Sequence, residues 1–474
     1  MTEIRRPAAL MANAWNGQTV IGTLDAESVW GQRPIDFVPT PKLLAPPAEA
    51  DMRDWRDTRV GWGVVLLDRP DLGAAGQAAV DPEFASLAAL VGQRGGVVVR
   101  YSASLGNGHV MRYYPDGAMQ QMSVIGSLPG TGRGALPMYL MIYASPKEIP
   151  WSFQYQLNSD RFVGRLDPSG AGVDNYLAAL QADWAGTAPD VGAPVLWTVN
   201  HGGGDITQLM AKFLGDALWA RMEADTDLPR RRRFRDGDAT GANLTAALAA
   251  LKPAFVATTS HGLTGPVIGT VPLADRLGIP VDGDFAAVDL DALFAAWSPE
   301  GAIWYAHACC SAGADSRSRF ADLFKDGDPM RKMLTDVADA AEACTSPLAQ
   351  RLLGAAAPAR AFIGHVEPTF DWTLRDPATG QPLANTLIDA LYNQLFATGS
   401  TGLATPVGYA LQKLFDEADA FFAAWVDAIS DVNQGVASAP DWALYRKLVG
   451  YDRQGTVILG DPAVSLPIHG STTP

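Results

Sequence analysis

Short apolar runs in the first half of the chain alternate with stretches whose apolar residues recur at helical spacing. VGWGVVLLD (60–68) has the pattern of a buried strand, FASLAALVG (84–92) that of a helix, and GGVVVRYSA (95–103) that of a second strand. Pro115-Asp116-Gly117 separates two strand-like arms and predicts a hairpin, and LPMYLMIYASP (136–146) predicts another buried strand. The first half is therefore expected to be α/β and to begin with a βαβ unit.

The second half continues this alternation with longer helical stretches. Its strand candidates are APVLWTVN (193–200), FVATTS (255–260), AIWYAH (302–307), ARAFIGHVEP (359–368) and TVILGDPAVSLPI (456–468). Its helical candidates are residues 206–222, 243–253, 383–396 and 407–429. Strands that alternate with helices predict a mainly parallel sheet covered by helices on both faces.

The chain divides into three regions by composition and pattern. Residues 1–55 are rich in proline and short on periodicity, which predicts an irregular N-terminal arm. We expect a first α/β half over residues 56–190, without obvious chemistry of its own. The candidate chemistry lies in a second half over residues 191–474, and a chain of 474 residues is long enough for both.

Composition and charge narrow the class of protein. Apolar residues make up 48% of the chain and charged residues 18%, a balance typical of globular proteins. The formal net charge of −15 argues against nucleic acid or an anionic membrane as a partner, because both need a basic face. Three cysteines do not make a disulfide framework, and the sequence has neither a signal-peptide core nor a membrane-spanning apolar window. We therefore expect a cytoplasmic protein.

The one basic run is PRRRRFR, residues 229–235. It lies between acidic stretches, and we interpret it as a solvated loop. The alternative is an exposed loop that a protease cuts or a partner protein binds, with Arg230–Arg235 as the processed segment.

The strongest chemical signal lies where two predicted strands end. FVATTS runs directly into His261-Gly262, and AIWYAH runs into Ala308-Cys309, 48 residues after His261. Reactive groups of parallel sheets gather beyond the carboxyl ends of the strands, so the imidazole and the thiol share an edge if the strands are neighbours. Histidine can take the proton of a thiol and make it nucleophilic. Gly262 lets a carbonyl approach its N–H, which with the N–H of Cys309 would form an oxyanion hole.

At these residues the sequence resembles the caspase-like cysteine peptidases. Ser260-His261-Gly262 after one apolar strand and Ala308-Cys309-x-Ser311 after another follow the order and spacing of the caspase signature. The chain looks closest to the gingipain-type and CHAT-type bacterial branches, through VGWGVVLLD, residues 136–166 and LGDPAVSL. The resemblance implies a caspase-like three-layer α/β/α sandwich, a non-catalytic α/β half before the catalytic one, and peptide-bond hydrolysis by a Cys309/His261 dyad.

The sequence departs from this family at Cys310, which follows Cys309, and at His307, which precedes Ala308. Side chains alternate along an extended segment, so only one of the two thiols can face His261. The motif register assigns the nucleophile to Cys309 and leaves Cys310 as a small buried filler. No third catalytic residue is indicated, and we expect a backbone carbonyl to orient His261.

Two aspartates are candidates for substrate binding. Asp205 ends the glycine-rich loop that would help to form the pocket for the residue before the scissile bond, and Asp315 lies six residues beyond Cys309. An acidic pocket would prefer arginine or lysine. The alternative is that Asp205 only caps a helix beginning at Ile206.

Two other kinds of site are weaker alternatives. NHGGGDIT has the glycines of a phosphate-binding loop but lacks the lysine and the spacing of the known motifs. A zinc site would lack a second pair of closely spaced ligands. Its candidate ligands are His201, His261, His307, Cys309, Cys310 and His365. We therefore expect neither a metal nor a cofactor.

Together these patterns predict a cysteine endopeptidase that acts on a specific protein or peptide substrate. Cys309 would be the nucleophile and His261 the general base. A regulatory partner protein is compatible with this prediction, whereas nucleic acid and membrane are not expected as partners. The alternative is a catalytically inactive scaffold that keeps the same fold and binds a partner protein.

Overall fold

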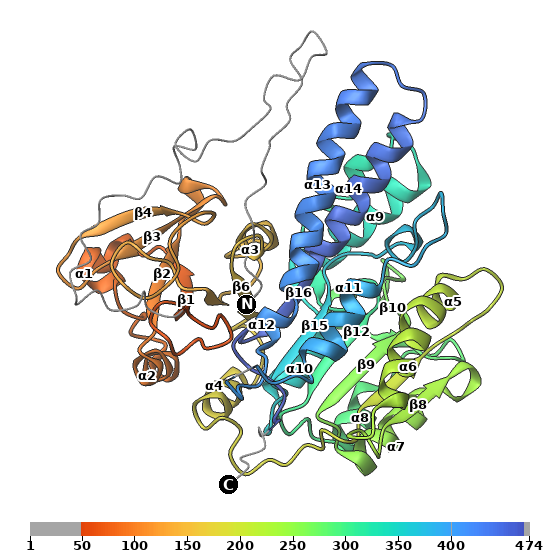
Figure 1. The fold of residues 1–474 in the computed structure, drawn as a ribbon, viewed down its shortest axis with the longest axis horizontal. Helices are drawn as coiled ribbons and strands as arrows, with labels where there is room; N and C mark the ends of the chain where they lie inside the picture. The colour runs from red at the N-terminus through yellow and green to blue at the C-terminus, as the bar shows by residue number, and fades with distance from the viewer. Residues whose placement is uncertain (1–48, 400, 469–474) are drawn as a thin grey trace, which may run out of the picture. The chain divides into compact units, whose positions relative to one another are not determined.

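A computed structural model describes residues 49–399 and 401–468 of the chain. The arm expected over residues 1–55 lies almost entirely outside the described residues. From residue 50 onward the described chain forms one compact α/β unit (Figure 1). Its centre is a 12-stranded sheet, with two additional two-stranded sheets at loop positions.

The strands of the large sheet come equally from the two halves of the sequence. In the first half they are β1 (Trp62–Leu67), β2 (Val97–Tyr101), β3 (His109–Tyr113), β4 (Met119–Ser123), β5 (Tyr139–Tyr143) and β6 (Phe162–Leu166). In the second half they are β7 (Val195–Thr198), β8 (Arg232–Arg235), β9 (Phe255–Thr259), β12 (Ile303–His307), β15 (Ala361–His365) and β16 (Thr456–Gly460). Every strand that the apolar runs predicted is present.

The strand order is β4-β3-β2-β1-β5-β6-β16-β15-β12-β9-β7-β8. Pairing is antiparallel at β2–β3, β3–β4 and β15–β16, and it is parallel at every other position in the large sheet, including β7–β9, β9–β12 and β12–β15. The expected hairpin is the β3–β4 pair, and Gly117 in its turn has a φ of +82°, a conformation that glycine adopts without strain. The mixed α/β class and the mainly parallel sheet are therefore confirmed.

Helices connect most of these strands. In the first half they are α1 (Gly73–Gln77), α2 (Ala85–Arg94), α3 (Trp151–Asn158) and α4 (Val173–Gln181). The central part of the chain has α5 (Ile206–Met210), α6 (Asp216–Ala224), α7 (Gly241–Leu251), α8 (Leu290–Ala296), α9 (Pro329–Ala341) and α10 (Pro347–Gly354). The last part has α11 (Asn385–Ile388), α12 (Val407–Ala410), α13 (Gln412–Asn433) and α14 (Ala439–Gly455).

One hydrophobic core extends across both halves of the sequence. It joins Leu87 of α2 and Leu177 of α4 to Leu196 of β7 and Ile303 of β12. Residues that alternate along β1 face different clusters: Val64 belongs to this core, whereas Val65 packs in a second cluster with Phe153 of α3. Helices therefore cover both faces of the sheet, and β16 joins the halves by lying between β6 and β15.

The basic run was predicted wrongly as a loop. Arg232–Arg235 forms β8, the edge strand that pairs in parallel with β7. An edge strand tolerates charged side chains, so its arginines hide the strand pattern in the sequence. Two of these arginines, Arg233 and Arg235, form ion pairs with Asp216.

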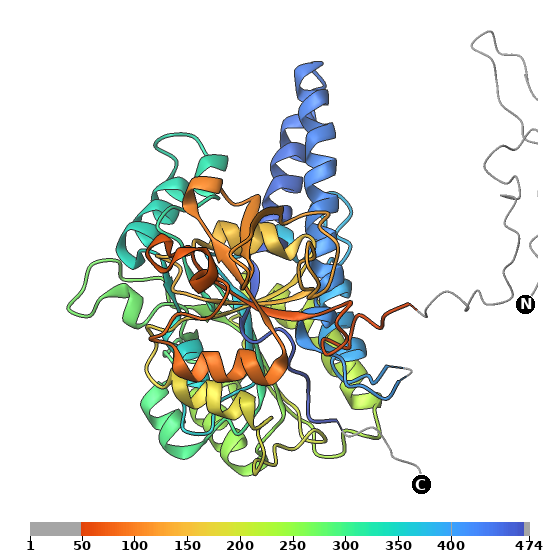
Figure 2. The same cartoon turned by 90° about the vertical axis from the view of Figure 1, so that its left-hand side faces the viewer.

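Two pairs of helices pack against each other: α2 with α4, and α13 with α14. Figure 2 shows α2 and α4 side by side, and hydrogen bonds from Gln93 to Gln181 O and from Gln181 to Ser86 O link them. The α13–α14 hairpin projects beyond the sheet in both ribbon views.

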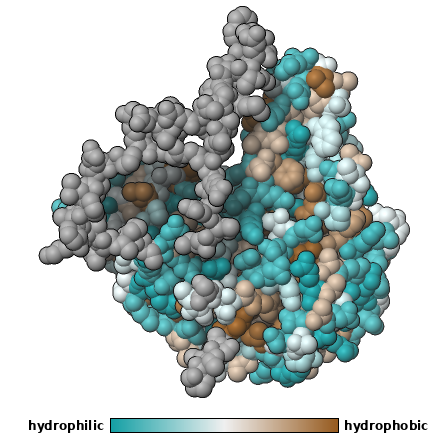
Figure 3. All heavy atoms as spheres, in the orientation of Figure 1, coloured by the Kyte–Doolittle hydropathy of each residue, from teal (hydrophilic) through white to brown (hydrophobic). Residues whose placement is uncertain are grey.

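The face drawn in Figure 3 is largely hydrophilic, with its hydrophobic residues in separate patches. No helix in the described ranges has the length and apolarity needed to span a membrane.

Candidate functional site

The two strands that precede His261 and Cys309 are neighbours in the sheet. β9 and β12 pair in parallel, with Thr259 opposite His307, and the N–H of Ser260 donates to His307 O at 3.2 Å. A Cβ placed on Gly262 would lie 2.0 Å from the carbonyl oxygen of Cys309. Only glycine permits this approach, so the backbones after both strand ends are in direct contact.

The backbone around Gly262 also directs its N–H group. His261 and Gly262 form a short strand, β10 (His261–Gly262), antiparallel to β11 (Pro280–Val281). The next residue, Leu263, donates its N–H to Ile279 O at 3.0 Å. Because N–H groups alternate along an antiparallel strand, the N–H of Gly262 points away from β11. It is therefore not used in the β10–β11 pairing.

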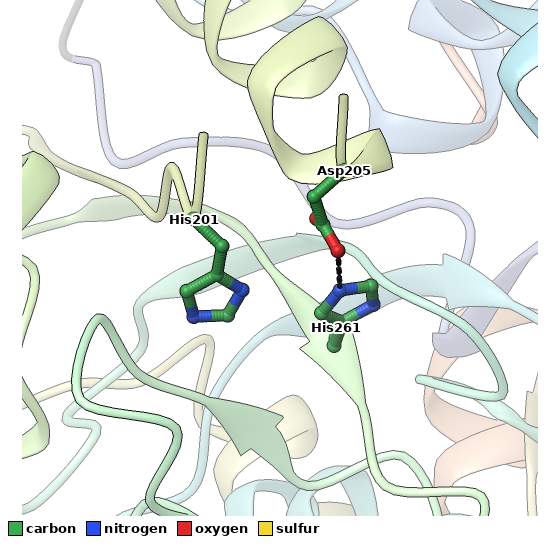
Figure 4. Close-up of side chains that lie close together, drawn as sticks. All are labelled: His201, Asp205 and His261. Atoms are coloured by element: carbon green, nitrogen blue, oxygen red, sulfur yellow. Dashed lines mark hydrogen bonds and ion pairs between the residues drawn. The ribbon is translucent and has the colours of Figure 1, made fainter. Parts of the chain in front are cut away.

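Asp205 hydrogen-bonds the imidazole of His261. Oδ2 of Asp205 lies 2.9 Å from Nε2 of His261, and the two side chains are 30% and 34% exposed (Figure 4). The other ring nitrogen, Nδ1, faces away from His201 in this view. A carboxylate therefore takes the place that the sequence had suggested for a backbone carbonyl.

Asp205 has a second role at the start of α5. Its Oδ1 accepts hydrogen bonds from Thr207 N at 2.8 Å and from Thr207 Oγ1 at 2.5 Å, which is the N-cap geometry. Burial opposes ionisation, but the hydrogen bonds from Thr207 and His261 outweigh it and lower the pKa of Asp205 below its ordinary value. Asp205 therefore caps the helix, as the alternative predicted, and holds His261, which sequence reasoning missed.

His201, in the same loop, completes this group. Its ring stacks on Phe285 at 3.8 Å between centroids and lies 5.5 Å from the ring of His261. Its Nε2 is 2.9 Å from Asp282 O, and its buried Nδ1 has no hydrogen-bond partner within the described chain. His201, Asp205 and His261 each offer one atom that could bind a metal ion, and these three atoms lie within 4.8 Å of one another.

The two adjacent cysteines lie in different environments. Cys310 is fully buried in an apolar cluster with Leu273 and Leu277, whereas Cys309 is partly exposed and its Sγ lies 3.8 Å from Thr369 O. Burial raises the pKa of the Cys309 thiol and raises that of Cys310 further. The argument from strand alternation was wrong in its premise, because the segment after His307 is a turn in which Cys310 has a φ of +54°.

Two of the suggested zinc ligands lie in a separate buried group. His365 Nε2 lies 3.2 Å from His307 Nδ1, which is also 2.7 Å from the Tyr305 hydroxyl. His365 Nδ1 lies 3.6 Å from Asp452 Oδ1, which accepts a hydrogen bond from Thr369 Oγ1 at 2.6 Å. Burial lowers the pKa of both histidines, so both are neutral at pH 7. The histidines that the sequence analysis considered as zinc ligands therefore lie in two separate groups, His307 with His365 and His201 with His261.

Ser311 and Asp315, the remaining candidates, are placed differently. Ser311 Oγ donates to Ala306 O at 3.0 Å and accepts from His365 N at 2.9 Å, so it links β12 to β15. Asp315 lines a cavity of about 400 Å³, together with Tyr155 and Arg319. Burial raises the pKa of Asp315. Asp315 is thus not part of the group around His261.

The order of the strands explains which site residues the sequence revealed. β9 lies between β12 and β7, so the loops after β12 and β7 meet the loop after β9 from either side. His261 and Cys309 were found because each directly follows an apolar run. The bond to Asp205 was missed because the sequence does not reveal that β7 is next to β9.

Comparison with known proteins adds no family assignment: no family model matches the chain, and no curated protein is significantly similar to it. The function is therefore argued from the strand-end geometry and the side chains that it brings together.

Proposed function

We propose that the chain is a cysteine endopeptidase with a caspase-like catalytic half, in which Cys309 is the nucleophile and His261 the general base. The observation that carries the proposal is the contact between the two strand ends, where the backbone of Gly262 lies against that of Cys309. This contact brings a thiol and an imidazole from neighbouring parallel strands to one edge of the sheet. Thiol-dependent acyl transfer needs a base close to the thiol, and the meeting of these two strand ends supports that arrangement.

The protonation states favour general-base catalysis over a preformed ion pair. The hydrogen bond from His261 Nε2–H to ionised Asp205 leaves Nδ1 with a free lone pair. The Cys309 thiol is protonated at rest because burial raises its pKa. Nδ1 of His261 therefore takes the thiol proton as the sulfur attacks the substrate carbonyl, and the resulting imidazolium is stabilised by the Asp205 carboxylate.

The rest of the reaction follows from the same groups. Attack forms a C–S bond and a tetrahedral oxyanion, which the N–H groups of Gly262 and Cys309 stabilise. Collapse breaks the peptide C–N bond, and His261 returns the proton to the leaving amine. Water, deprotonated by His261, then hydrolyses the thioester and regenerates the thiol.

Asp205 acts in this scheme as a positioning residue. Both of its oxygens are already bonded, one to Thr207 and the other to His261. Pairing with a substrate guanidinium would have to compete with these bonds. The preference for arginine or lysine therefore stays a prediction, and we assign Asp205 first to His261.

The decisive experiment compares the adjacent cysteines. Peptide-bond cleavage, measured as new protein termini in a proteome digest, should disappear in Cys309→Ala and persist in Cys310→Ala. An irreversible thiol-directed peptide probe should modify Cys309 in the parent protein, as mapped by mass spectrometry. Cleavage by Cys309→Ala at the parent rate would disprove the assignment.

The inactive scaffold remains the second candidate, and one observation favours it. The thiol of Cys309 donates to Thr369 O and has a raised pKa, so it is not activated at rest. A scaffold would give no new termini and no probe labelling, while a partner protein would still bind to the folded chain. The labelling experiment therefore separates the two functions.

A further inference from the structure

His201 carries a ring nitrogen that the protein leaves unpaired at the candidate site. Its Nε2 lies 2.9 Å from Asp282 O, a carbonyl that only accepts, so Nε2 carries the proton and Nδ1 carries a lone pair. That Nδ1 is buried and without a partner within the described chain, and it faces Asp205 and His261 (Figure 4). A buried acceptor without a donor costs stability, so its retention calls for a ligand.

The surroundings of His201 hold its ring in this orientation. The carboxylate of Asp282 accepts from Gly241 N at 2.9 Å and from Asp284 N and Ala286 N at 3.0 Å, which fixes the carbonyl that His201 contacts. Phe285 stacks on a face of the His201 ring, although Phe285 is 70% exposed and has a φ of +62°. An exposed aromatic residue in an unfavourable backbone conformation is explained if it positions His201.

From these contacts we infer that His201 Nδ1, Asp205 and His261 Nε2 bind a divalent zinc-class cation, which switches off His261 as a base. The donor set is two imidazoles and one carboxylate, which suits zinc and its late first-row neighbours and not magnesium or calcium. Imidazole ligands of zinc usually donate their second N–H to a backbone carbonyl, as His201 does to Asp282. The inhibitory part of this inference depends on the proposed function, whereas the binding site does not.

The geometry requires only a small rearrangement. Zinc bonds of about 2.0–2.1 Å place tetrahedral ligand atoms roughly 3.3 Å apart. Nε2 of His261 and Oδ2 of Asp205 are already 2.9 Å apart, and all three ligand atoms lie within 4.8 Å of one another. Closing the set requires His201 to shift toward the other two ligands, and water would fill the fourth position.

Metal binding would move the proton of His261 from one nitrogen to the other. Without metal, Nε2 carries the proton toward Asp205 and Nδ1 is the free base. With a cation bonded to Nε2, the neutral ring carries its proton on Nδ1. That nitrogen then has no lone pair to accept the thiol proton of Cys309, so nucleophilic attack is blocked.

Binding is tested directly with zinc chloride and purified full-length protein. Equilibrium dialysis with elemental analysis should find one tight equivalent of zinc, and His201→Ala should weaken that binding at least tenfold. Two matched controls should keep it: His109→Ala removes a histidine of β3 outside the group, and Cys309→Ala removes the neighbouring thiol. Magnesium chloride should not compete.

Cobalt substitution gives a readout that is independent of activity. Cobalt at the inferred site should show tetrahedral d–d absorption without a thiolate charge-transfer band. Unchanged zinc binding in His201→Ala, or a charge-transfer band that disappears in Cys309→Ala, would overturn the ligand assignment.

Inhibition is tested against each variant's own metal-free cleavage rate. Zinc should inhibit the parent, a chelator should reverse this, and the inhibitory concentration should rise at least tenfold in His201→Ala. Zinc binding without any cleavage would refute the peptidase and leave the site intact. Cleavage without zinc binding would refute the site and leave the peptidase intact.

Discussion

Two histidine–aspartate pairs lie near the ends of β9 and β15, and they differ mainly in their exposure to water. His261 and Asp205 are 34% and 30% exposed and 2.9 Å apart, whereas His365 and Asp452 are 4% and 1% exposed and 3.6 Å apart. The first pair is partly open to solvent. The second is enclosed, and burial lowers the pKa of its histidine. The same two residue types therefore lie at a solvent-accessible strand end in one place and in the packed interior in the other.

The buried pair belongs to a network that connects three elements. Asp452 of α14 accepts from Thr369 after β15, and His365 contacts His307 at the end of β12. The adjacent Arg453 bonds both Asp452 and Glu417. Charges removed from water are tolerated only when all of them are paired, so this network is sensitive to the loss of any member.

The largest expected effect is on the rate of cleavage when His261 is replaced by alanine. His261→Ala should reduce cleavage about 10²- to 10⁴-fold, the usual contribution of general acid–base catalysis. The urea midpoint should change little because the side chain is partly exposed. His365→Ala should show the reverse, a lower urea midpoint with cleavage retained in the folded fraction. Equal losses of activity in both folded variants would break the comparison.

The second prediction concerns the stability of the buried network. Asp452→Ala leaves Arg453 with one carboxylate fewer and Thr369 without its carboxylate acceptor. Breaking one partner out of a buried ion pair costs about 3–5 kcal/mol of unfolding free energy. Equilibrium urea denaturation measures this loss. A cost below about 1 kcal/mol would mean that water reaches the network.

The third prediction follows from the lowered pKa values of His307 and His365. The unfolded chain takes up these two protons below about pH 6.5 while the native state does not, so stability falls with decreasing pH. Each histidine therefore lowers the free energy of unfolding as the pH falls below about 6.5. Burial of Glu367 raises its pKa to about 7, which gives a contribution of opposite sign between its unfolded and native pKa values.

Glu367→Gln removes the opposing group, so stability should fall more steeply between pH 6.5 and pH 5 in this variant than in the parent, as measured by urea denaturation across that range. A slope that is unchanged in Glu367→Gln would show that Glu367 is ionised in the native state.

Sequence reasoning recovered elements whose pattern is local. β1, β9, β12 and β15 are continuous apolar runs, and burial on both faces makes such runs recognisable. β8 was missed because an edge strand with charged side chains has no apolar run. The insertion of β16 between β6 and β15 was also missed, since pairing between distant segments leaves no periodic signal.

At the candidate site, too, the sequence revealed the residues that follow a local pattern and missed a contact between distant segments. His261 and Cys309 follow recognisable strands, so the contact between the backbones at these strand ends could be anticipated from the strand ends alone. Asp205 was noticed for its charge, but its bond to His261 depends on β7 lying next to β9. The buried His307 and His365 were grouped with the partly exposed His201 and His261 because a sequence carries no direct record of which side chains water reaches.

The smallest expected effect separates the two roles of Asp205. Asp205→Ala loses the N-cap of α5, and Asp289→Ala loses the equivalent cap of α8, where Asp289 accepts from Asp291 N and Ala292 N. Each should cost about 1 kcal/mol by urea denaturation at pH 7. Only Asp205→Ala should also reduce cleavage, because only Asp205 holds His261.

The stability difference between the parent and Asp205→Ala should also depend on pH, which tests whether the Asp205 carboxylate stabilises the fold through its charge. The pKa of Asp205 is lowered in the native state, so its stabilising contribution is complete above its ordinary value of about 3.9 and is lost as pH falls below that value. The gap between parent and Asp205→Ala should therefore narrow from pH 4 to pH 3. If the gap is constant over this range, the Asp205 carboxylate does not stabilise the fold through its charge.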